Sequence, residues 1–125
     1  MRKFIQFFTV IVITLRATIS AFAAEPIATG TFGKGSTHGS VKIEQRNGEW
    51  ILTFGDDFFH EGSPDPWVAL GKDGFQRSGI IGELKQFKGT HSLVIEKLNP
   101  QDFNEVYVWC VEHNSSLGRA MLVWE

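Results

Sequence analysis

Cysteine is almost absent from this sequence: Cys110 is the only one among 125 residues. No internal disulfide can form, and a thiol-disulfide oxidoreductase of the usual kind is disfavoured because it needs a second, resolving cysteine. Covalent haem is excluded too, because the chain has no C-x-x-C-H attachment run. The single thiol is therefore buried and inert, bonded to another molecule, or chemically employed.

Long apolar runs are also absent. The most apolar stretch, Phe4 to Leu15, has 12 residues, and a membrane-spanning helix needs roughly 20. Arg2 and Lys3 precede it, and Ala21-Phe22-Ala23 follows it with the small-x-small pattern that signal peptidase reads. We therefore expect a signal peptide over residues 1–23 and an extracytoplasmic protein, periplasmic or secreted. A retained signal anchor is the alternative.

Positive charge is sparse in the remainder. Three of the 12 basic residues, Arg2, Lys3 and Arg16, lie in the expected signal, which leaves nine basic against 14 acidic residues, a net charge of −5. That sign argues against a sequence-independent nucleic-acid binder, and no polybasic run is present that would hold an anionic membrane. Residues 24–125 suit one domain with a modest core.

The remainder reads almost entirely as strands and turns. The clearest element is a hairpin in which VKIEQR and EWILTF flank Asn47-Gly48, a pair suited to a two-residue type I′ turn. In that register Ile43 faces Leu52, and every apolar pair of the hairpin lies on one face. Further strands are expected at 67–71, around 80–84, and at 92–98, 105–111 and 119–124, with one short helical turn opening at Asn99-Pro100.

Seven or so short strands separated by turn signals indicate an all-β fold, either an antiparallel β-sandwich of about seven to eight strands or a small barrel. The strand 105–111 is apolar on both faces, so we expect it inside a sheet, with Cys110 and Trp109 on opposite faces. No helix longer than one turn is expected after the signal. The expected core comprises Ile43, Leu52, Phe54, Leu93, Ile95, Val106, Val108 and Leu122.

Four segments carry a family resemblance: GTFGKGSTHGSVKIE, LTFGDDFFHEGSPDPWVALG, GELKQFKGTHSLVI and VYVWCVEHNSSLGRAML. They span nearly all of residues 30–123, and the last is the most specific. The chain resembles the DM-thirteen domain family, a proposed electron-transfer module found alone in exported bacterial proteins and beside DOMON domains in animal cell-surface proteins such as Skeletor. The resemblance implies a β-sandwich, export, and a redox cysteine acting as a bare thiol or as a ligand to a group such as haem. His113 stands where the family is expected to carry an aromatic residue.

Cys110 has two interpretations. On spacing alone it is a small buried hydrophobe on a central strand, because free cysteine is among the most buried residue types. The functional interpretation needs an accessible thiolate, for which His113 and Arg119 are the cations nearby in the sequence. In that case Cys110 is the catalytic residue, and Cys110, Trp109 and His113 would bind a cofactor.

The C-x-x-H spacing of Cys110 and His113 is also typical of blue-copper sites, which add an upstream histidine and a weak axial methionine. The copper hypothesis uses His113, Cys110 and His60 as ligands, with His38 as the alternative to His60 and Met121 in the axial position. An exposed loop histidine and a core methionine explain the same residues without a metal. The cofactor stays open between haem, copper and none.

The loop GDDFFHEGSPDPW is rich in acidic residues, but its spacing fits no calcium loop, and its Asp, Gly and Pro residues are typical of turns. Two functions remain. The first is an exported redox or electron-transfer module centred on Cys110, serving an unidentified redox partner or extracytoplasmic protein. The second is a non-catalytic extracytoplasmic binding or adhesion β-sandwich in which Cys110 is structural. Neither nucleic acid nor a stable membrane span is expected, and whether the protein is an enzyme stays open.

Overall fold

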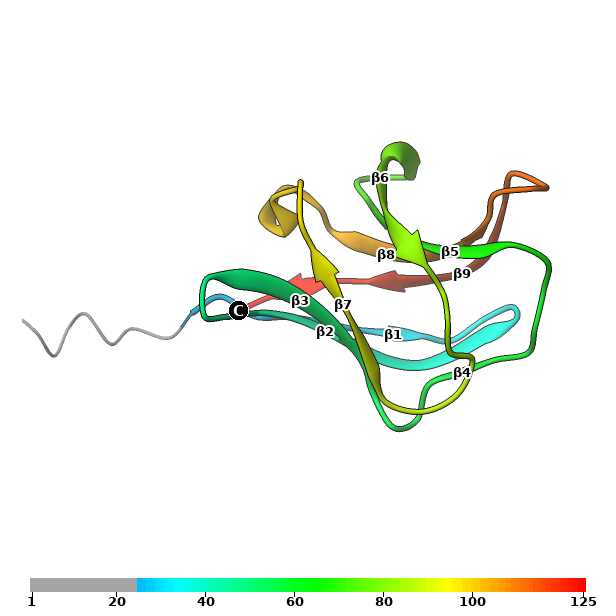
Figure 1. Ribbon diagram of the computed structural model, residues 1–125, viewed down its shortest axis with the longest axis horizontal. Coiled ribbons are helices and arrows are strands. Elements are labelled where there is room, and N and C mark those ends of the chain that lie inside the picture. Colours follow the sequence, from blue (N-terminus) through cyan, green and yellow to red (C-terminus); the bar gives the residue numbers. More distant parts are fainter. Residues whose placement is uncertain (1–24) are drawn as a thin grey trace, which may run out of the picture.

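The computed structural model describes residues 25–125, and the expected signal peptide lies outside them. Strands make up most of the described chain (Figure 1). The elements are β1 (Ala28–Phe32), β2 (Thr37–Arg46), β3 (Glu49–Phe54), β4 (Phe59–His60), β5 (Pro66–Gly71), β6 (Phe75–Glu83), β7 (His91–Ile95), the 3-10 helix η2 (Pro100–Asp102), β8 (Glu105–Cys110), β9 (Ser115–Met121) and β10 (Val123–Trp124). Within residues 25–125, no helix is long and apolar enough to cross a membrane.

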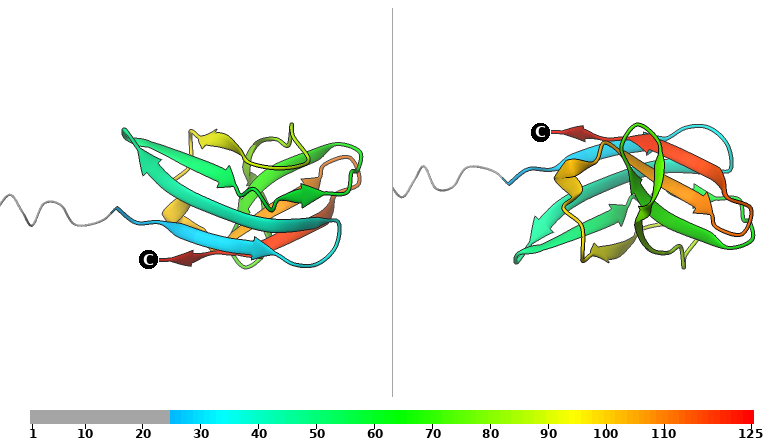
Figure 2. Two further views of the ribbon diagram at one scale, coloured as in Figure 1. Left: turned by 90° about the horizontal axis from the view of Figure 1, so that it is seen from below. Right: turned by 90° about the horizontal axis from the view of Figure 1, so that it is seen from above.

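The strands form one antiparallel sheet that folds over on itself. Their order is β6-β5-β8-β9-β1-β2-β3-β7, with β10 beside β1 and β4 beside β2. Figures 1 and 2 show β5 and β8 in one layer and β2 and β3 in the other. The expected all-β antiparallel sandwich is confirmed, and the sheet comes close to closing like a barrel, with β6 and β7 as its two edges.

The hairpin of β2 and β3 has the expected register. Ile43 pairs with Leu52, and the turn residues Asn47 and Gly48 have φ values of 52° and 83°. Positive φ at both positions is what a type I′ turn requires, and asparagine and glycine adopt it most readily. The short helix was also expected: the Asn99 side chain accepts a hydrogen bond from the Gln101 N–H and caps η2.

The sequence analysis missed β1 and β4, and it expected β2, β6 and β9 to begin later than they do. β1 was missed because its interior, Thr-Gly-Thr, lacks the large apolar residues that mark a strand, although Ala28 and Phe32 at its ends are buried. β4 has only two residues and exists through its pairing with β2. β6 begins at Phe75, before the expected start near residue 80, and follows the bulged edge of β5.

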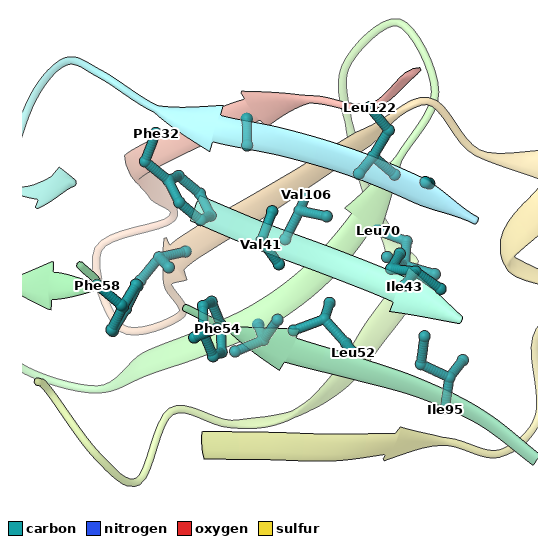
Figure 3. Packing of buried hydrophobic residues seen from close by; sticks show 14 of the residues in the cluster. Phe32, Val41, Ile43, Leu52, Phe54, Phe58, Leu70, Ile95, Val106 and Leu122 are labelled. Carbon is teal, nitrogen blue, oxygen red and sulfur yellow. The ribbon is translucent and has the colours of Figure 1, made fainter. Parts of the chain in front are cut away.

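Apolar side chains fill the space between the two layers (Figure 3). Of the expected core residues, Leu93 is only partly buried, and the others are buried: Ile43, Leu52, Phe54, Ile95, Val106, Val108 and Leu122. Phe32 and Phe58 were not expected there, and both pack against Phe54, with ring centroids 6.3 and 4.2 Å away. This aromatic cluster stabilises the contact between β1, β3 and the segment before β4.

The two ends of the sandwich differ. Near one end, Ile27 and Glu125 exchange two backbone hydrogen bonds of 3.3 and 2.8 Å, so the first and last described segments lie side by side. β8 runs away from this end, between β5 and β9, and finishes at the opposite end (Figure 1). Cys110, its last residue, therefore lies at the end far from the first and last described segments.

Candidate functional site

Cys110 is enclosed at the rim of the apolar core. Its side chain lies on the inner face of β8, as those of Val106 and Val108 do, and only 1% of the residue is exposed. The thiol donates a hydrogen bond to the Pro64 carbonyl oxygen at 3.2 Å and accepts one from the His113 backbone N–H at 3.4 Å. The sulfur thus has one hydrogen-bond acceptor and one hydrogen-bond donor beside it.

His113 reaches Cys110 through its backbone. It lies in the turn between β8 and β9, its side chain is exposed, and the recorded contact with the sulfur uses the backbone N–H rather than the imidazole. The C-x-x-H spacing thus produces a hydrogen bond that holds the turn against the end of the strand. A role for the His113 side chain as a ligand stays a prediction.

His60, in β4, is buried with both ring nitrogens hydrogen bonded. Nδ1 lies 2.9 Å from Thr37 Oγ1, and Nε2 lies 2.8 Å from Ser63 Oγ. The Phe87 ring packs edge-on against the imidazole. Burial lowers the pKa of His60, and the nearby Glu61 opposes this effect only in part. The ring is therefore neutral at neutral pH.

The directions of these hydrogen bonds follow from Thr37. Its hydroxyl has one proton and donates it to the Leu117 carbonyl oxygen at 2.9 Å. Thr37 Oγ1 must then accept from the His60 Nδ1–H, and the unprotonated Nε2 accepts from the Ser63 hydroxyl. A directed chain of three hydrogen bonds, from Ser63 to the carbonyl of Leu117, fixes one tautomer of the ring.

Ser63 and Pro64 connect His60 to Cys110. The Ser63 hydroxyl contacts the imidazole, and the carbonyl of the next residue contacts the thiol. Two predicted site residues thus lie at the same end of the sandwich, linked through the loop between β4 and β5. The sequence analysis treated this loop as turn chemistry, and Thr37 gave no signal because it lies 23 residues before His60.

Trp109 lies on the other face of β8. Its ring stacks on Phe75, with centroids 3.7 Å apart and planes 2° apart, and meets the Tyr107 ring edge-on. Alternation along the strand therefore separates the Trp109 ring from the Cys110 thiol, as the sequence analysis expected. Its buried Nε1 has no hydrogen-bond partner within the described chain. A role for Trp109 in cofactor binding stays a prediction.

Arg119 belongs to this outer face as well. Its guanidinium forms an ion pair of 3.1 Å with the buried carboxylate of Glu105, which also accepts hydrogen bonds from the Gly74 N–H and the Tyr107 hydroxyl. Burial, and next the charge of Glu105, raise the pKa of Tyr107. Arg119 is thus engaged away from the sulfur, on the face opposite Cys110.

The surroundings of Cys110 do not fit a haem or copper ligand in this conformation. Within residues 25–125, no three His, Cys, Asp or Glu side chains are grouped so that they could hold a metal ion. Both nitrogens of His60 are hydrogen bonded, and Met121 is exposed, its sulfur accepting from Arg119. Three surface grooves of about 660, 670 and 420 Å³ open elsewhere, and Cys110 lines none of them.

The acidic residues before β5 shape turns. Asp57 accepts hydrogen bonds from the backbone N–H and the hydroxyl of Ser40, and these bonds, the backbone one first, lower the pKa of Asp57. Asp65 accepts from the Trp67 indole N–H. These contacts agree with the turn interpretation of the loop.

A family model described as Electron transfer DM13 matches residues 31–122. The match includes all of β2 to β9, and with them Cys110, His60 and the loop that connects them. No curated protein and no solved structure matches the chain.

Proposed function

Because this chain belongs to the Electron transfer DM13 family, we propose that it is an exported redox module whose working group is the thiol of Cys110. Export rests on the basic start, the short apolar run and the Ala-x-Ala pattern of residues 1–23. The redox role rests on the family and on the position of the thiol. The working state is a bare thiol, since the packing around the sulfur fits no metal or haem.

The observation that carries the proposal is the pair of polar backbone groups that contact the Cys110 sulfur at the end of β8, a strand whose other inward side chains are apolar. Pro64 accepts from the thiol, and the His113 N–H points at the sulfur. When the thiol loses its proton, this N–H becomes a donor to the thiolate, whereas the Pro64 carbonyl then faces a negative charge. Forming the thiolate therefore requires Pro64 to move away while the His113 contact remains.

With no second cysteine, the chemistry open to Cys110 is exchange with a partner's disulfide. The Cys110 proton passes to water, the thiolate attacks one sulfur of the disulfide, and the other sulfur leaves as a thiolate. The product is a mixed disulfide between Cys110 and the partner. The electron pair of the broken S–S bond goes to the leaving sulfur, so no further oxidant is needed.

The test is adduct formation with oxidised glutathione. Native protein should gain one glutathione, detected by intact mass spectrometry, while its circular dichroism stays native, and Cys110→Ser should gain none. If the native protein forms no adduct and protein unfolded in urea forms it readily, the redox proposal is wrong.

The burial of Cys110 favours the second candidate function, a non-catalytic extracytoplasmic binding or adhesion sandwich with a structural cysteine. In that case Cys110→Ser would change only the melting temperature, and the native thiol would resist every reagent. The glutathione experiment separates the two functions, because only the redox module reacts while folded.

A further inference from the structure

The loop between β4 and β5, loop 61–65, passes over Cys110. It crosses from one layer of the sandwich to the other at the end far from Ile27 and Glu125 (Figure 1). Glu61, Gly62, Pro64 and Asp65 are exposed, and the thiol below them is buried. Because the Pro64 carbonyl accepts the hydrogen bond of the thiol, the loop lies directly against the sulfur and covers it.

Backbone hydrogen bonds anchor the loop only at its ends. The Glu61 N–H donates to the Ser36 carbonyl at 2.9 Å, and the Asp65 carbonyl accepts from the Val111 N–H at 3.2 Å. Between these anchors, residues 62–64 make no backbone-to-backbone hydrogen bond within the described chain. Their recorded hydrogen bonds are from the Ser63 hydroxyl to His60 and from the Cys110 thiol to Pro64.

The Ser63 hydrogen bond is well placed to hold the loop. Its acceptor, Nε2 of His60, belongs to a buried ring whose other nitrogen is fixed through Thr37 to the backbone of Leu117. A rigid, correctly oriented acceptor makes this bond stronger than one to a mobile surface group. When the hydrogen bond between Ser63 and His60 breaks, residues 62–64 can move while the two anchoring hydrogen bonds remain, and Pro64 moves with them.

We propose that loop 61–65 is a latch over Cys110, and that Ser63 and His60 are positioning residues that keep it closed. This inference rests on the proposed function, since it describes how the redox thiol is protected and released. In the closed state the loop covers the sulfur, and the thiol donates a hydrogen bond to the Pro64 carbonyl. In the open state a disulfide reaches the sulfur, and the His113 N–H remains to stabilise the thiolate.

The experiment measures the alkylation rate of Cys110 by iodoacetamide in the folded protein. Ser63→Ala removes the hydroxyl and should raise the rate by about threefold to tenfold, the factor expected when one net hydrogen bond is lost from the closed state. Ser63→Thr keeps a hydroxyl and should restore a rate near that of the unmodified protein.

Ser92→Ala is the matched control. Ser92 lies on β7, away from loop 61–65, and its hydroxyl is hydrogen bonded to that of Thr53 on β3 at 3.1 Å. An equal acceleration in both alanine variants would mean general loosening of the fold and would overturn the latch, and so would an unchanged rate in Ser63→Ala. The glutathione experiment tests the proposed function separately: if native protein forms no adduct, the redox function is wrong, whatever the alkylation rates show.

Discussion

Replacing Leu52 by alanine tests the core on which the sandwich depends. Leu52 is fully buried in β3, with Ile43 on β2 and Leu93 on β7 as its cross-strand partners. The change removes three buried carbon groups worth about 0.8 kcal/mol each, or about 2.4 kcal/mol of transfer free energy. The remaining cavity adds to this, because β2 and β7 hold β3 on both sides and limit its collapse. We expect a loss of about 3–4 kcal/mol in the free energy of unfolding.

Urea unfolding followed by tryptophan fluorescence measures this loss, and the slope with denaturant should stay unchanged. Val94→Ala is the control, because Val94 lies beside Leu93 on β7 but is 40% exposed. It should cost less than about 0.5 kcal/mol. If Leu52→Ala costs no more than the control, the inward assignment of Leu52 and our account of the core are wrong.

Three further predictions concern pH, backbone space and export. Burial lowers the pKa of His60 in the folded protein. As the pH falls below about 6.5, the unfolded chain therefore binds a proton that the folded chain does not, and the free energy of unfolding should decrease until the pH passes the lower folded pKa. Thermal melts at several pH values should show this decrease, and His60→Gln should make it smaller. In the same melts, Gly39→Ala should lower the melting temperature more than Gly48→Ala. Both glycines have positive φ, but a Cβ at Gly39 would collide with the Asp57 carbonyl, whereas a Cβ at Gly48 would meet open space. Equal decreases in melting temperature would contradict this reasoning. N-terminal sequencing of the exported protein should begin at Ala24, and finding Met1 would disprove signal cleavage.

The parts of the fold that the sequence predicted are those set by local chemistry. The β2–β3 hairpin follows from Asn47-Gly48 and from alternation on either side, and the cap of η2 follows from Asn99-Pro100. β1 was missed because a Thr-Gly-Thr strand forms only when neighbouring strands supply its pairing, and those neighbours are distant in the sequence.

At the candidate site, the sequence predicted which side chains of β8 share a face, but it did not predict the contacts around Cys110. Alternation along β8 placed Cys110 and Trp109 on opposite faces of the sheet, as observed. The contacts of Thr37 with His60 and of Pro64 with Cys110 join residues 23 and 46 positions apart, and only folding brings them together. Spacing also suggested an imidazole beside the sulfur where the structure records a backbone N–H, because a periodic pattern does not say which atom of a turn residue faces the strand.

The two hydrogen bonds between Ile27 and Glu125 place the first and last described segments side by side, so a fusion or tether can be attached at one end of the sandwich. A linker attached to either terminal segment leaves from the same spot, and a host protein that received this domain in a surface loop would need a gap of only about 5 Å, the distance between paired strands. Cys110 lies at the far end of β8, so a tether to an electrode or a bead leaves that end of the sandwich, with loop 61–65, facing the solution. The domain can thus be immobilised or fused to another protein without covering the end of the sandwich that contains Cys110.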